Sequence, residues 1–121
     1  MVRHFCIAIL IAASSPAFAG KADVVDAKAT KDADGTYTFS VTVKSDDTGW
    51  EKYADRWEVT GRDGAVLGVR VLAHPHETEQ PFTREQSGIA VPPGTNQGTI
   101  RAHDKVEGCG GAEYKLTPPQ E

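Results

Sequence analysis

The stretch that decides the fold is "TYTFSVTVKS", residues 36–45. In it Tyr37, Phe39, Val41 and Val43 alternate with Thr, Ser and Lys. Apolar residues at every second position are typical of a β-strand that buries one face. Most of the residues are also β-branched or aromatic, which strands favour. The stretch therefore predicts a half-buried strand.

Six further runs of similar character predict six more strands. No window of the sequence shows sustained helical periodicity, so the predicted class is all-β. Seven short antiparallel strands in a chain of this length are typical of an immunoglobulin-like or fibronectin-III-like sandwich. The six runs are residues 23–29, 55–61, 65–73, 83–92, 98–103 and 112–117.

The N-terminal segment, residues 1–19, has the features of a secretory signal peptide. Arg3 precedes the apolar run 5–13, and the small-x-small sequence "AFA" ends at Ala19. The apolar run is too short to cross a bilayer, so no membrane insertion is expected. We therefore predict cleavage near Ala19-Gly20 and a single β-sandwich domain, residues 20–121, in the periplasm or secreted.

The charge balance restricts the class of partner. The chain has 13 Lys and Arg against 17 Asp and Glu, for a formal net charge of −4. It contains no cluster of basic residues that would attract the phosphates of a nucleic acid. The remaining candidates are a protein partner or a small ligand.

The two cysteines, Cys6 and Cys109, suggest a further expectation. Loss of residues 1–19 would remove Cys6, so Cys109 is expected to have no partner within the mature chain. Such a cysteine either links two chains into a Cys109-linked dimer or remains a partly buried, inert thiol.

The chain has no Gly-x-Ser-x-Gly, HExxH or phosphate-binding glycine motif. We therefore expect no enzymatic activity, with a thiol-dependent enzyme using Cys109 and His103 as a lesser alternative.

The connections between the predicted strands are of two kinds. Three are plain turns, and three are longer loops that carry aromatic residues, carboxylates, histidines or the thiol. If every strand is antiparallel to the one before it, successive connections alternate between the two ends of the domain. The three longer loops then share one end, where rigid sheets would present them as a binding surface. The turns are 32–35, 62–64 and 92–98, and the longer loops are 46–54, 74–82 and 104–112.

Candidate metal ligands lie in the sequence "HPHETEQPFTR", residues 74–84. In an extended segment His74 and His76 point the same way, so the two imidazoles are placed to share a metal ion. His103 is predicted to lie at the same end, and imidazole with carboxylate suits copper or zinc. Alternatively, one histidine binds loop backbone and the other meets solvent. Further candidate ligands are Glu77, Glu79, Asp104 and Cys109.

The same segment contains candidate binding residues. Glu79 and Arg84 are candidates for contact with a ligand or partner, and Phe82 is predicted to close one end of the core. The alternative for Arg84 is a structural latch that orders the loop, because guanidinium–carboxylate pairs commonly fix loops. Its expected partner is Asp46, Asp47 or Asp55.

The aromatic residues of the preceding loop allow two interpretations. Trp50 and Tyr53 either form a platform for a ligand or protein partner or cap the open end of the core. Trp57, in the middle of a predicted strand, is expected to be buried.

Three segments carry a resemblance to known proteins: "DDTGWEKYADRWEV" (46–59), "HPHETEQPFTR" (74–84) and "SGIAVPPG" (87–94). They resemble segments of small exported proteins of Gram-negative bacteria. The resemblance covers most of the mature chain and implies a periplasmic β-sandwich. The resemblance implies no activity, cofactor or catalytic residue.

Taken together, the motifs and loops predict an exported, non-enzymatic module that recognises a ligand or partner through loops at one end. The alternative is a copper or zinc site.

Overall fold

The computed structural model describes residues 21–119, and the predicted signal peptide lies outside them. The described part is all-β, as predicted, with seven strands and one short 3-10 turn. The ends of the strands differ from the predicted ends by only a few residues. The elements are β1 (Asp23–Lys31), β2 (Tyr37–Lys44), β3 (Ala54–Thr60), η1 (Arg62–Gly64), β4 (Val66–Val71), β5 (Phe82–Ile89), β6 (Gly98–Asp104) and β7 (Tyr114–Leu116).

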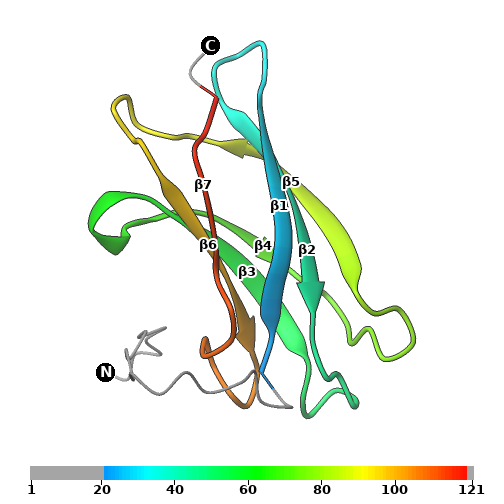
Figure 1. The fold of residues 1–121 in the computed structure, drawn as a ribbon. Coiled ribbons are helices and arrows are strands. Elements are labelled where there is room, and N and C mark those ends of the chain that lie inside the picture. The colour runs from blue at the N-terminus through cyan, green and yellow to red at the C-terminus, as the bar shows by residue number, and fades with distance from the viewer. Residues whose placement is uncertain (1–20, 120–121) are drawn as a thin grey trace.

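The strands form two sheets that face each other (Figure 1). One sheet has three strands in the order β1-β2-β5, and the other has four in the order β4-β3-β6-β7. Every neighbouring pair within a sheet is antiparallel. The chain passes between the sheets in the β2–β3, β4–β5 and β5–β6 connections, which join elements of different sheets.

The core lies between the sheets and consists of the inward-facing residues of both. On β2 the alternation predicted from the sequence is realised, because Phe39, Val41 and Val43 are each 0% exposed. Trp57 of β3 is also 0% exposed and Phe82 of β5 is 1% exposed, which confirms both predictions of burial. Removing a large apolar side chain from water contributes roughly 1.5–3 kcal/mol, so these residues dominate the stability of the fold.

Strand β4 is an edge strand whose apolar residues do not all face the core. Val66, Val69 and Val71 are exposed. The register pairs Val71 with Arg56 and Val69 with Glu58. Both valines therefore lie on the outer face of the sheet. No residue of β4 is fully buried, so the apolar character of the run does not mark a buried face.

The inner face of β4 approaches the opposite sheet at Gly68. A Cβ atom at this position would lie 2.6 Å from Cγ1 of Ile89, which is buried at the end of β5. Only glycine therefore allows the two sheets to pack this closely here.

The two sheets are also joined where β1 runs beside the segment before β7. Val24 N donates to the carbonyl of Ala112 at 2.8 Å, and Ala112 N donates to Oδ1 of Asp23 at 2.7 Å. A Cβ at Gly111 would overlap the carbonyl of Ala22, so this contact also requires glycine.

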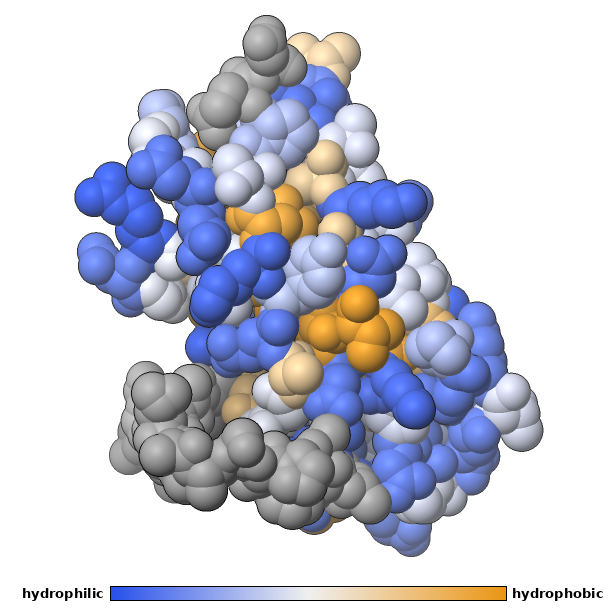
Figure 2. Space-filling view, viewed as in Figure 1, coloured by the Kyte–Doolittle hydropathy of each residue, from blue (hydrophilic) through white to orange (hydrophobic). Residues whose placement is uncertain are grey.

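On the face of the molecule shown in Figure 2, hydrophilic residues predominate, and the apolar ones form small, separate patches.

Candidate functional site

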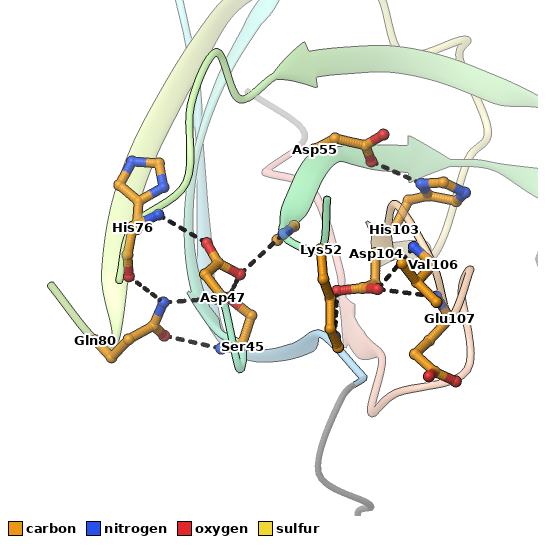
Figure 3. A network of polar contacts seen from close by, with 11 residues as sticks. Ser45, Asp47, Lys52, Asp55, His76, Gln80, His103, Asp104, Val106 and Glu107 are labelled. Carbon is orange, nitrogen blue, oxygen red and sulfur yellow. Dashed lines mark hydrogen bonds and ion pairs between the residues drawn. The ribbon is translucent and has the colours of Figure 1, made fainter. Parts of the chain in front are cut away.

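The three longer loops meet at one end of the molecule, where two buried aspartates connect them (Figure 3). Asp47, in the β2–β3 connection, is 8% exposed. Its carboxylate accepts hydrogen bonds from Ser45 Oγ at 2.7 Å, Ala54 N at 3.0 Å and His76 N at 2.8 Å. The bond to His76 ties the β2–β3 connection to the β4–β5 connection.

Gln80 strengthens this link between the first two loops. Its Oε1 accepts a hydrogen bond from Ser45 N at 2.8 Å, and its Nε2 donates to the carbonyl of His76 at 2.8 Å. Both polar atoms of the amide are thus used to hold the histidine-bearing loop against the end of β2.

Asp104 connects the first loop to the third. It ends β6 and is 0% exposed, and its carboxylate accepts hydrogen bonds from Lys52 Nζ at 2.9 Å, Val106 N at 2.9 Å and Glu107 N at 2.8 Å. In addition, Lys105 N donates to a carbonyl of the β2–β3 connection at 2.9 Å. The prediction that the three longer loops share one end is confirmed. We call this end, residues 45–53, 72–81 and 105–113, the three-loop surface.

Trp50 projects from the three-loop surface. Its side chain is 61% exposed, and the ring of half-buried Tyr53 meets it edge-on, with the centroids 5.7 Å apart. A tight turn holds the backbone, with Thr48 N and Lys52 N donating within it at 3.0 and 3.1 Å. Lys105 Nζ donates to the carbonyl of Trp50 at 2.7 Å and lies 5.7 Å from the centroid of Tyr53. Trp50 is therefore open to solvent, whereas the ring of Tyr53 is only partly accessible.

His74 and His76 lie side by side but in different environments. His74 is exposed, whereas His76 is 5% exposed. Their ring centroids are 4.6 Å apart, and the ring of His76 also stacks on that of Phe82, with the centroids 4.0 Å apart and the planes 11° apart. Burial lowers the pKa of His76, and the positive charge of Arg84 lowers it further. The imidazole of His76 is therefore neutral at neutral pH.

His103 does not join the other two histidines. It is buried on β6, and its Nδ1 lies 2.6 Å from Oδ1 of Asp55. Figure 3 shows Asp47 and Lys52 between His76 and His103. Within residues 21–119 no group of three or more His, Cys, Asp or Glu is arranged to hold a metal ion. The structure thus forms a histidine pair rather than the predicted set of three.

Arg84 pairs with a different carboxylate from the three predicted. Its Nη2 lies 3.0 Å from Oε1 of Glu79, and its guanidinium lies 5.6 Å from the centroid of Phe82. The prediction of an Asp46, Asp47 or Asp55 partner was wrong, since Asp47 already binds the loop backbone and Asp55 binds His103. The hydrogen bond from Arg84 lowers the pKa of Glu79. These two candidate binding residues therefore neutralise each other.

Cys109 is not the unpaired thiol that we expected. It is 9% exposed and disulfide-bonded. The chain's other cysteine, Cys6, lies outside the described residues. The expectation rested on removal of residues 1–19, whereas this structure is that of the whole sequence, so the Cys109-linked dimer stays a prediction for the cleaved chain. A disulfide sulfur is not a nucleophile, so Cys109 cannot act as a catalytic thiol in this disulfide-bonded form.

Sequence reasoning did not identify Asp47 and Asp104 as the residues that organise this end. For Asp104 a signal was available, because an aspartate at the end of a strand commonly accepts from backbone N–H groups two and three positions later. Asp47 offered no such signal, since its partner His76 is 29 positions away.

The sequence is similar to that of a known protein. A protein of Halomicrobium mukohataei named "Putative lipoprotein" is 43% identical over 91 residues, which is 75% of this chain and 44% of the relative. The chain thus spans less than half the length of that relative. No family model matches the sequence. No solved structure matches it either. The described residues include no helix with the length and apolar composition that a membrane span requires.

Proposed function

We propose that the protein is an exported, non-enzymatic module that recognises a ligand or protein partner through the three-loop surface. The observation that carries the proposal is Trp50, which is 61% exposed on a turn fixed by backbone hydrogen bonds. Tryptophan is enriched among the residues that contribute most to binding, because it brings a large contact area with few rotatable bonds.

The rigidity of the surface supports the proposal. Asp47, Gln80 and Asp104 hold the three loops in one arrangement before any partner arrives. A surface that is already ordered loses less conformational entropy on binding, so more of the contact energy appears as affinity. Both aspartates are used for loop backbone, which leaves them poorly placed for acid–base catalysis.

Strand order and similarity support the other parts of the proposal. A three-stranded sheet β1-β2-β5 facing a four-stranded sheet β4-β3-β6-β7 agrees with an immunoglobulin-like or fibronectin-III-like sandwich, a fold that often binds through its end loops. The relative is named a lipoprotein, which agrees with export. Together with the signal-like N-terminal segment, this supports a location in the periplasm or outside the cell.

Site-specific photo-crosslinking in cells that export the protein tests the proposal. A photoreactive residue replaces Trp50 in one variant and Val66 in the other. Val66 is the matched control, because it is apolar and 50% exposed but lies at the start of β4, outside the three-loop surface. We expect a discrete crosslinked product from position 50 and none from position 66.

Either of two results would contradict the proposal. Equal crosslinking from both positions would indicate non-specific contact with apolar surface. No product from position 50, with the variant exported at the normal level, would show that Trp50 meets no partner.

A further inference from the structure

The side chain of His76 has an unusual environment. It is 5% exposed, and neither Nδ1 nor Nε2 has a hydrogen-bond partner. Buried polar groups are almost always hydrogen-bonded, because burying them without a partner is unfavourable. The proposed recognition surface does not use these nitrogens, so their presence inside the loop needs another explanation.

The neighbouring His74 has a nitrogen suited to bind a cation. Its Nδ1 lies 3.0 Å from the carbonyl of Pro75. A carbonyl only accepts hydrogen bonds, so Nδ1 carries the proton and Nε2 has a free lone pair. Histidines that bind metals usually donate their second ring nitrogen to a backbone carbonyl or carboxylate in this way, which orients the ring.

We propose that His74 and His76 together bind a copper(II) ion, with water completing the coordination. The rings are adjacent, with centroids 4.6 Å apart. The exposed ring of His74 is free to turn about its side-chain bonds until its Nε2 meets the ion. This metal site is independent of the proposed recognition by Trp50.

Copper(II) fits this pair better than zinc does. Structural zinc sites use four protein ligands and catalytic ones three, whereas this pair offers two imidazole nitrogens. Copper(II) accepts tetragonal sites of mixed nitrogen and oxygen, and it binds a given set of nitrogen ligands more tightly than zinc does.

The surroundings hold the ring of His76 ready for an ion. Stacking on Phe82 fixes the ring of His76, and the bond from its backbone N–H to Asp47 fixes its main chain. Arg84, whose guanidinium lies 5.6 Å from the centroid of the same Phe82 ring, is neutralised by Glu79 at 3.0 Å. A cation entering the site therefore meets the ring of His76 already in place, and the exposed ring of His74 turns to complete the pair.

Calorimetric titration of copper(II) and zinc into the untagged full-length protein tests the site. We expect stoichiometric binding of copper(II), tighter than that of zinc. Replacing a residue that only supports a ligand typically weakens a metal site about tenfold or more, so His74→Ala should weaken copper(II) binding at least as much. His74 is exposed, so the variant is expected to fold, which circular dichroism will verify.

His4→Ala is the matched control, because it removes a histidine from outside the described residues. Its copper(II) affinity should equal that of the unchanged protein. Electron paramagnetic resonance provides a second measurement: nitrogen couplings from both imidazoles are expected in the unchanged protein and from a single imidazole in His74→Ala. The proposal is overturned if the unchanged protein does not bind copper(II), if His74→Ala binds it equally well, or if His4→Ala abolishes binding.

Discussion

Two adjacent aspartates in the β2–β3 connection differ sharply in what surrounds them. Asp46 is exposed, whereas Asp47 is 8% exposed and accepts hydrogen bonds from Ser45, Ala54 and His76. When the acceptor is removed from a buried, charge-assisted set of hydrogen bonds, the remaining donors stay buried without a partner. Leaving those donors buried and unpaired costs more free energy than burying no polar group there at all. The contribution of each aspartate is therefore decided by its neighbours.

We expect Asp47→Ala to lower the free energy of unfolding by about 2–4 kcal/mol. The main-chain N–H groups of Ala54 and His76 lose their acceptor in this variant. Asp46→Ala is the matched control and should change stability by no more than about 0.5 kcal/mol. Urea unfolding measures both, and equal losses in the two variants would contradict the role given to Asp47.

The carboxylate of Glu58 predicts a pH dependence of stability. Burial alone would raise its pKa, but hydrogen bonds from Arg56 and Arg101 outweigh burial and lower the pKa below its ordinary value of 4.5. The folded state therefore binds the proton less well than the unfolded state. The resulting stabilisation is fully present above pH 4.5 and is lost as the pH falls through the lowered pKa.

Glu58→Gln removes this titration, so its stability should fall less steeply than that of the unchanged protein below pH 4.5. Unfolding free energies measured from neutral to acid pH give the two slopes. Glu51→Gln, which removes the same charge from an exposed carboxylate, controls for the change in net charge. Parallel slopes for Glu58→Gln and the unchanged protein would show that Glu58 is not the group responsible.

Strand β4 shows why an apolar run alone does not identify a buried face. Its valines at 66, 69 and 71 are exposed, while Gly68 faces the core beside Ile89. The pairing of β4 with β3 decides which residues turn inward. The existence of the strand was predicted from the sequence, but which of its residues face the opposite sheet was not.

Gly68→Ala is expected to destabilise the fold by about 1–3 kcal/mol, because the new Cβ overlaps the buried side chain of Ile89. Adding Ile89→Ala should recover part of the loss caused by Gly68→Ala, which a double-mutant cycle measures as a coupling between the two positions. Gly98→Ala is the control in β6, since its nearest neighbour would lie at an ordinary 3.5 Å. An equal loss for Gly68→Ala in the presence and absence of Ile89→Ala would contradict the overlap.

The two sheets share one core, so the described domain should unfold as a single unit. Trp57 is 0% exposed between the sheets and Trp50 is 61% exposed on the three-loop surface. Trp50→Phe therefore leaves a fluorescence signal that reports on the core alone. We expect the urea transition of this variant to coincide when followed by fluorescence and by far-ultraviolet circular dichroism.

Separate midpoints for the two signals would show that the sheets lose structure independently. The result would also affect the proposed recognition of a partner, because the loops of the three-loop surface are attached to strands of both sheets. If the sheets separate before unfolding, the surface is disrupted at the same point. A single transition therefore agrees with a surface whose shape persists for as long as the fold does.

The sequence alone determined the seven strands and the placing of the three chemically mixed loops at one end. Both follow from local information: a side-chain period of two identifies a strand, and strict antiparallel order alternates the connections. Only the tertiary structure decided which strands share a sheet and which residues of β4 face the other sheet. It also decided that Glu79 rather than an aspartate pairs with Arg84, and that His103 lies apart from His74 and His76. These features depend on contacts between residues distant in the chain, whose free energies are set by burial and geometry that no local pattern records.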